Sequence, residues 1–289
     1  MRIPKHWTKA SYTGADLDRK EITCSAWGWS FDSLSAAKAD ALSRARRVFD
    51  CLINGRRPDS YGYSDRPLRE EIVDTLWRDG KEIAIITRNR YGALVLNSAS
   101  VLFVDIDFPR IKPTGLWDAL LLSLSSKRRR WRKAAVAELT LESVRDWAQG
   151  HPNSAFRVYR TCAGLRILFV DKLYEPNSDE TSRILRELGS DPLYCTLTSK
   201  QECFRARLTP KPWRCRIAKP PNQYPWNDEA AERLYRTWER RYEEASKDYT
   251  VCELVEARGN GACNGEVAAV QEMHDRLTCG ERDGQRGFA

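Results

Sequence analysis

The stretch KEIAIITRNRYGALVLNSASVLFVDIDF, residues 81–108, decides the fold class. It contains three short runs rich in β-branched and other apolar residues, at 82–88, 91–97 and 100–108, and turn-forming residues separate them. Runs of this length and composition are typical of β-strands. We therefore expect three consecutive strands that pair as a meander.

Helical and strand-like segments surround this stretch. Ser33 precedes a run of strong helix formers that extends to residue 53, and Pro67 begins a second such run that Gly80 ends. Residues 1–31 have no regular pattern. Further along, we expect a helical region at 114–149, a hairpin within 156–171, a helix at 178–188, strands near 191–197 and 203–208, and a helix at 227–247. This order predicts an α+β fold with a mostly antiparallel sheet that helices cover on one side.

Three parts follow from this pattern. We expect an N-terminal helical region at 1–80, an α+β core at 81–250 that ends in the charged helix, and a loosely ordered tail at 251–289. The tail is rich in glycine, has poor periodicity and holds seven acidic and four basic side chains. Such segments often lack a fixed structure.

The composition excludes several classes of protein. Of the 289 residues, 42% are hydrophobic and 30% are charged, which is typical of a globular chain. No apolar run approaches the ~18–20 residues that span a bilayer, and the N-terminus lacks a secretory signal, so we expect a cytoplasmic protein without a membrane partner. Nine cysteines without a Cys-x-x-Cys pair and only three histidines argue against structural zinc. The net charge of +8 favours a polyanionic partner.

Asp105 and Asp107 are the most informative pair of polar residues. Successive side chains in a strand point to opposite faces, so both carboxylates share one face while Val104, Ile106 and Phe108 fill the other. Carboxylate oxygens suit Mg²⁺ or Mn²⁺, and two such ions can hold a triphosphate during phosphoryl transfer. The alternative interpretation is a solvated strand face that carries two charges.

Two further stretches offer basic side chains. Arg160 and Arg166 flank a predicted turn near Gly164, where they can meet phosphates. Arg205 and Arg207 share one face of a predicted strand, and the run 203–219 contains six basic residues and no acidic one. Such a strip suits a triphosphate or a nucleic-acid backbone. The alternatives are an exposed basic hairpin and a solvated edge strand.

The block KRRRWRK at residues 127–133 places six basic residues around Trp131. On a helix these charges can grip phosphates while the indole stacks on a base. A solvated helix turn is the alternative interpretation. The predicted nucleic-acid-binding residues are Arg128, Arg129, Arg130, Trp131, Arg132 and Arg214.

The order of these elements resembles the archaeo-eukaryotic primase superfamily, the primase-polymerases. That family has an Asp-x-Asp/Glu strand, then a strand with a small-x-His motif, then a strand with a further Asp. A Tyr and an Asn-Arg-x-Phe-Arg stretch with a downstream Lys follow the last Asp. The matching residues are Asp105 and Asp107, then Gly164-Leu165-Arg166, then Asp191 with Tyr194, Phe204, Arg205 and Lys211, so the resemblance covers about residues 82–215.

The resemblance implies an RRM-like primase-type core and a metal-dependent nucleotidyltransferase. Its substrates would be nucleoside triphosphates and a DNA or RNA template, and its cofactor Mg²⁺ or Mn²⁺. The implied catalytic and metal-binding residues are Asp105, Asp107 and Asp191. The implied nucleotide-binding residues are Arg160, Thr161, Gly164, Arg166, Arg205, Arg207 and Lys211.

One position departs from the family pattern, because Arg166 stands where the family has its His. An arginine binds phosphate but cannot act as a neutral imidazole. A non-catalytic nucleic-acid-binding protein of the same fold is therefore one alternative, and a metal-dependent nuclease that uses the same carboxylates is another. The third carboxylate also stays open between Asp191 and Asp171, which ends a predicted hairpin strand.

Overall fold

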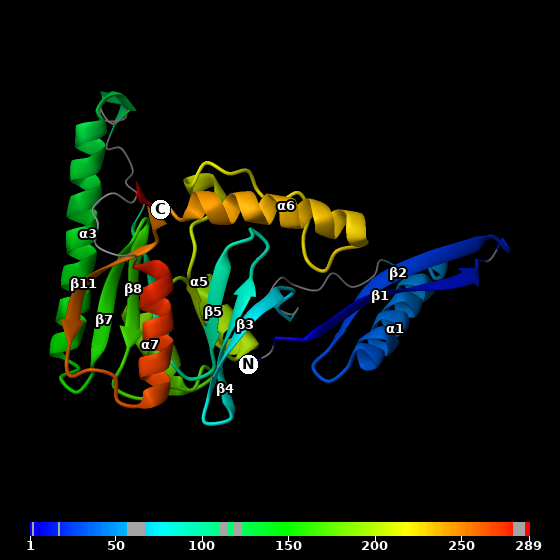
Figure 1. The fold of residues 1–289 in the computed structure, drawn as a ribbon, viewed down its shortest axis with the longest axis horizontal. Helices are drawn as coiled ribbons and strands as arrows, with labels where there is room; N and C mark the ends of the chain where they lie inside the picture. The colour runs from blue at the N-terminus through cyan, green and yellow to red at the C-terminus, as the bar shows by residue number, and fades with distance from the viewer. Residues whose placement is uncertain (2, 17, 57–66, 110–114, 118–122, 280–286) are drawn as a thin grey trace.

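The computed structural model describes the whole chain except residues 2, 17, 57–66, 110–114, 118–122 and 280–286. The described residues form an α+β fold whose two large sheets are antiparallel, which confirms the predicted class. Figure 1 shows a body built on these two sheets, with a smaller N-terminal unit beside it. Within the described residues, no helix has the length and apolar character needed to cross a membrane.

The N-terminal unit, at the right of Figure 1, is a β-hairpin packed on one helix. β1 (His6–Ala15) pairs antiparallel with β2 (Glu21–Ser30), and α1 (Leu34–Ile53) begins after the predicted N-cap Ser33. The expectation of an irregular segment at 1–31 was wrong. β1 lacks the apolar alternation that is typical of a half-buried strand, because its half-buried positions include Thr8, Ala10 and Gly14 beside Tyr12.

The first large sheet has the strand order β3-β4-β5-β9. Its strands are β3 (Glu71–Arg78), β4 (Lys81–Arg88), β5 (Leu94–Ser98) and β9 (Phe204–Arg207). The helix expected from Pro67 to Gly80 was wrong, because most of this run is β3. Asp79 and Gly80 both have positive φ and close a tight turn into β4, so strand pairing overrides the local helix propensity.

The second large sheet has the strand order β11-β7-β8-β6. Its strands are β11 (Cys252–Arg258), β7 (Phe156–Thr161), β8 (Gly164–Phe169) and β6 (Phe103–Asp107). The hairpin β7–β8 was predicted and is confirmed. The meander was wrong at its third strand, because β6 leaves β5 and pairs with β8.

Residues 251–279 of the expected loosely ordered tail are part of the body. β11 pairs antiparallel with β7, and α7 (Gly265–Thr278) buries Val267 and Val270 in the core. β11 is an edge strand and carries two of the acidic residues of this segment, Glu253, which is exposed, and Glu256, which is half-buried. Two short strands, β10 (Tyr249–Thr250) and β12 (Gly287–Phe288), pair parallel near the C-terminus.

Four more helices complete the body. α4 (Asp179–Glu187) and α6 (Glu229–Ser246) confirm two predicted helices, and α3 (Ser126–Gln149) forms the second half of the predicted helical region. The strand expected near 191–197 was wrong, because α5 (Pro192–Gln201) occupies it. Asp191 is its N-cap and Pro192 its first residue, a combination that favours a helix start. A short 3₁₀ helix, η2 (Pro212–Arg214), follows β9.

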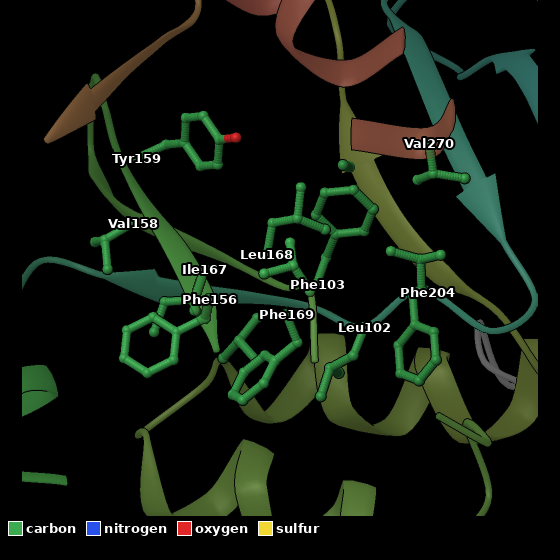
Figure 2. Close-up of a cluster of buried hydrophobic side chains, with 14 of the residues drawn as sticks. Leu102, Phe103, Phe156, Val158, Tyr159, Ile167, Leu168, Phe169, Phe204 and Val270 are labelled. Atoms are coloured by element: carbon green, nitrogen blue, oxygen red, sulfur yellow. The ribbon is translucent and has the colours of Figure 1, made fainter. Parts of the chain in front are cut away.

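One hydrophobic core connects the two large sheets. Figure 2 shows Phe103, Phe156 and Phe169 of the second sheet near Phe204 of β9, with Val270 reaching the cluster from α7. These side chains are all buried in one continuous core. The edge strands β6 and β9 lie next to each other at the rim of this core.

Candidate nucleotide-binding cleft

Side-chain hydrogen bonds fix the junction of the two sheets. The Tyr194 hydroxyl on α5 donates to the Phe103 carbonyl at 2.9 Å and accepts the Arg205 N–H at 3.3 Å. Nη1 of Arg166 donates to the Arg207 carbonyl at 2.9 Å. These bonds hold β6, β8 and β9 at a set spacing, so charged residues on the three strands share one environment.

A cleft of about 520 Å³ opens beside this junction, and we call it the cleft below. The β4–β5 loop, β5, β6, α5, β9 and the segment after β9 supply its walls. Its charged lining residues are Glu70, Arg90, Asp105, Arg205, Arg207 and Lys211. Four cations and two anions line it, so the cleft favours an anionic ligand.

Of the three predicted aspartates, Asp105 lines the cleft, whereas Asp107 and Asp191 lie outside its lining but near enough to each other for their charges to interact. Asp105 and Asp107 lie on the same face of β6, while Ile106 between them is buried. Asp191 caps α5 by accepting the Tyr194 N–H at 3.0 Å. The Asp191 backbone N–H also reaches the Asp105 carbonyl at 3.4 Å, which anchors the start of α5 on β6.

The pKa of Asp107 reflects the nearby carboxylates. Burial raises the pKa of Asp107, and the nearby carboxylates of Asp191 and Asp105 raise it further. The positive charges of Lys211 and Arg207 act in the opposite direction but do not offset the first three effects. The carboxyl group of Asp107 therefore interacts both with neighbouring carboxylates and with the basic residues that line the cleft.

Asp105 is already neutralised by a buried arginine. Nε and Nη2 of Arg166 bind its two carboxylate oxygens at 2.8 and 3.2 Å, and the Arg166 side chain is only 3% exposed. Behind Arg166 lies His274 of α7, with its Nε2 at 3.5 Å from Arg166 Nη1. Burial lowers the pKa of His274, and the charge of Arg166 lowers it as well, although Asp275 acts in the opposite direction. His274 is therefore a neutral neighbour of the ion pair.

The acidic residues fit one divalent cation better than two. Asp105 uses both oxygens on Arg166, which leaves Asp107 and Asp191 as donors. Among the residues that the structure describes, no group of three or more His, Cys, Asp or Glu side chains is placed to hold a metal ion. Mg²⁺ commonly binds one or two protein carboxylates and completes its coordination with substrate phosphates and water. Asp107 and Asp191 suit a cation of that kind.

The basic side of the cleft includes two cations with unsatisfied charge. Nε of Arg207 is buried without a hydrogen-bond acceptor. Burial lowers the pKa of Arg207 and of Lys211, and the charge of Arg214 nearby lowers both further. A bound anion would relieve this repulsion, because it would supply the negative charge that the protein does not.

Arg205 has a different role from these two residues. Its Nη2 contacts both carboxylate oxygens of Glu70, at 2.8 and 2.7 Å, and the Thr87 hydroxyl donates to the same carboxylate at 2.6 Å. Arg205 therefore joins β9 to the segment before β3, and Glu70 offsets its charge.

The other predicted nucleotide-binding residues do not line the cleft. Thr161 Oγ1 donates to the Gly164 carbonyl at 3.1 Å and closes the β7–β8 turn. A Cβ on Gly164 would lie 2.1 Å from the Ile106 carbonyl oxygen, so the glycine allows β6 and β8 to pair closely. The guanidinium of Arg160 lies 6.0 Å from the ring centroid of Phe288.

Asp171 and the basic block at residues 127–133 both lie outside the cleft. Both carboxylate oxygens of Asp171 accept the Tyr174 hydroxyl at 3.0 Å, so this residue is part of a turn after β8 and not of the cleft. The basic block lies at the start of α3, where Arg128 and Arg130 are exposed, Arg132 is half-buried and Trp131 is 71% exposed. The side chain of Arg129 lies outside the described residues. None of the block residues lines the cleft, whereas Arg214 lies close enough to influence Arg207.

Sequence reasoning missed three contributors to this site. Glu70 was inside a run that we expected to be helical, and His274 was inside the expected tail. Arg90 lies in the turn between β4 and β5, and only the position of this turn was predictable. No short motif marks these residues, because chain topology alone brings them to the cleft.

The comparisons with known proteins identify no relative. No family model matches the chain, and no curated protein and no solved structure gives a significant match. The function therefore has to be argued from the cleft itself.

Proposed function

We propose that this protein is a metal-dependent nucleotidyltransferase of the primase-polymerase type, which binds a nucleoside triphosphate in the cleft and acts on a nucleic-acid template. The observation that carries the proposal is that Asp107 interacts electrostatically with Asp191 and also with Arg207 and Lys211, the two basic residues that line the cleft. An acidic pair with excess negative charge and a basic pair with excess positive charge suit a metal–triphosphate complex, which presents both signs of charge.

The order of elements supports the proposed RRM-like core. β6, α3, β7, β8 and α4 follow one another in the chain, and β6 and β7 pair antiparallel with β8 on either side. The aspartates of β6 then face the residues that follow α4. The third motif departs from the family pattern, because Asp191 is the N-cap of α5 and does not lie on a strand.

Each side chain has a definite role under this proposal. Lys211 and Arg207 would hold the phosphate oxygens, and Asp107 and Asp191 would hold Mg²⁺ or Mn²⁺ on the opposite side of the triphosphate. When bound, the metal ion would supply positive charge where negative charge builds up on the phosphates. Tyr194 and Arg166 would keep β6 and β9 at a fixed spacing, so that the cleft is formed before the ligand enters.

The Arg166–Asp105 ion pair favours a second candidate function. With Asp105 neutralised, two protein carboxylates are available instead of three, and the family's imidazole is absent. A protein with this cleft could bind nucleotide or nucleic-acid phosphates without turnover. Binding and product formation therefore have to be measured separately.

Calorimetric titration of a nucleoside triphosphate with Mn²⁺ tests the proposal first. We expect binding to the wild type that Asp107→Asn/Asp191→Asn weakens strongly in the presence of Mn²⁺. Lys211→Gln should weaken binding with and without the metal. Asp171→Asn is the matched control, since this carboxylate lies outside the cleft. No binding to the wild type would refute the proposal.

Primer extension then separates the two candidate functions. Template-dependent elongation by the wild type, lost in the double aspartate variant, is the result expected of a nucleotidyltransferase. Binding without elongation or cleavage would support the non-catalytic alternative. Cleavage of the nucleic acid without elongation would indicate a nuclease that uses the same carboxylates.

A further inference from the structure

A second cavity, of about 510 Å³, lies in the N-terminal unit, and we call it the N-terminal pocket. Three tryptophans line it, Trp7 from β1 and Trp27 and Trp29 from β2. Its cationic lining residues are Arg44 and Arg47 of α1, Arg56 and Arg69, against a single acidic residue, Asp50. The pocket thus combines aromatic surfaces with excess positive charge, and nothing in the proposed function uses it.

Part of this pocket is organised before any ligand binds. The rings of Trp7 and Trp29 lie 5.4 Å apart, and the guanidinium of Arg44 stacks 3.6 Å above the Trp29 ring. Asp40 holds this arrangement, since its carboxylate accepts hydrogen bonds from Arg44 Nε at 2.7 Å and from the backbone N–H of Trp29 at 3.1 Å. The Trp7 indole N–H is buried without an acceptor, so a polar ligand atom would satisfy it.

Further arginines connect the N-terminal pocket with the cleft. The guanidinium of Arg69 lies 5.0 Å from the Trp27 ring, and Arg69 also lines a small cavity that Arg90 shares. Arg90 in turn lines the cleft. The small cavity therefore shares one arginine with the N-terminal pocket and another with the cleft.

We infer that the N-terminal pocket binds the bases of single-stranded nucleic acid and directs the strand toward the cleft. Aromatic rings stack on any base, and arginines contact the phosphates between bases, which is the usual chemistry of sequence-tolerant single-strand binding. An acidic peptide would match the charges but would bring no aromatic base to stack on the tryptophan rings. A duplex keeps its bases stacked inside and cannot offer them to the pocket.

Fluorescence anisotropy of a labelled oligothymidylate with the full chain tests this inference. We expect Trp27→Ala to weaken binding by roughly tenfold, within the range known for base stacking, and Trp27→Phe to retain most of the affinity. Arg47 is exposed, so Arg47→Gln should leave the fold intact. It should reduce the slope of log K against log salt by about 0.7, as the loss of one phosphate contact predicts for a single strand.

Trp77→Ala is the matched control, because Trp77 is 59% exposed on β3 and does not line the pocket. Equal losses for Trp77→Ala and Trp27→Ala would overturn the inference, as would wild-type affinity in Trp27→Ala. Equally tight binding of a duplex with the same dependence on Trp27 would also overturn it. Titration of the triphosphate with Mn²⁺ should be unchanged in Trp27→Ala, so this inference and the proposed function can fail independently.

Discussion

At the scale of single residues, Asp105 and Asp107 have opposite effects on stability although they share one strand face. Asp105→Asn leaves the buried Arg166 charge without its carboxylate, and removing one partner of a buried pair costs about 3 kcal/mol. Asp107→Asn removes a charge that Asp191 and Asp105 repel, so its stability should be unchanged or slightly higher. Urea unfolding of both variants at neutral pH without metal measures the difference. Equal stability of the two variants would contradict the structural role of Asp105.

The raised pKa of Asp107 predicts an unusual pH dependence. The folded protein holds a proton at Asp107 more tightly than the unfolded chain, whose pKa is near the ordinary value of 3.8. The contribution of Asp107 to stability therefore falls as the pH rises from 3.8 through the raised pKa, and it is constant above that window. Asp107→Asn should match the wild type at the acidic end and exceed its stability above the window.

Unfolding curves of both proteins across this pH range check the prediction. Mn²⁺ should reduce the difference above the window, because a bound cation stabilises the charged carboxylate. Burial also raises the pKa of Asp171, so Asp171→Asn should show a pH dependence of the same sign but no response to Mn²⁺. A difference between wild type and Asp107→Asn that shrinks as the pH rises would have the wrong sign for this account.

At the scale of elements, the sequence predicts best where a local signal and the tertiary environment agree. The helices after Ser33, Ser178 and Asp228 were predictable, because each has a side-chain cap and a periodic apolar face. The run after Pro67 has helix-forming residues, but pairing with β4 makes it a strand. Strand partners lie outside any local window, which is also why the departure of β6 from the expected meander was not predictable.

Substitutions in α7 test whether this helix, in the segment expected to be a loosely ordered tail, contributes to the core. Val270 is fully buried in the common core, whereas Leu277 on the same helix is 37% exposed. We expect Val270→Ala to lower the free energy of unfolding by roughly 2 kcal/mol and Leu277→Ala by less than half of that. Thermal and urea unfolding measure both. Two neutral variants would indicate that the segment after residue 250 does not contribute to the fold.

At the scale of the whole molecule, part of the candidate site could be predicted from the sequence. Asp105, Asp107, Arg205, Arg207 and Lys211 were singled out because each belongs to a run whose composition is unusual for its element, whereas Asp191 was identified through the family resemblance. The ion pair that neutralises Asp105 and the contribution of His274 were not predictable. They depend on α7 and β8 meeting behind β6, and such a contact leaves no pattern in either segment.

If one strand contacts both the N-terminal pocket and the cleft, which are linked by a small cavity that shares an arginine with each, affinity should depend on the length of the strand. A strand of about 6 nucleotides should occupy the N-terminal pocket alone, whereas one of about 25 nucleotides can also reach the cleft. The second contact is then intramolecular, so affinity should rise with length and level off once both sites are occupied. Trp27→Ala should lower the affinity for strands of every length, because the N-terminal pocket supplies the first contact.

Lys211→Gln distinguishes a continuous path from two unrelated sites. Lys211 lines the cleft and not the N-terminal pocket. This variant should therefore lower the affinity only for strands that are long enough to span both sites. Anisotropy titrations of a length series at constant salt measure the effect, and Asp171→Asn again provides the control outside both cavities. If Lys211→Gln lowered the affinity for short and long strands equally, the short strands would already occupy the cleft. If it weakened neither, the strand would not reach the cleft, and the template would have to enter by another route.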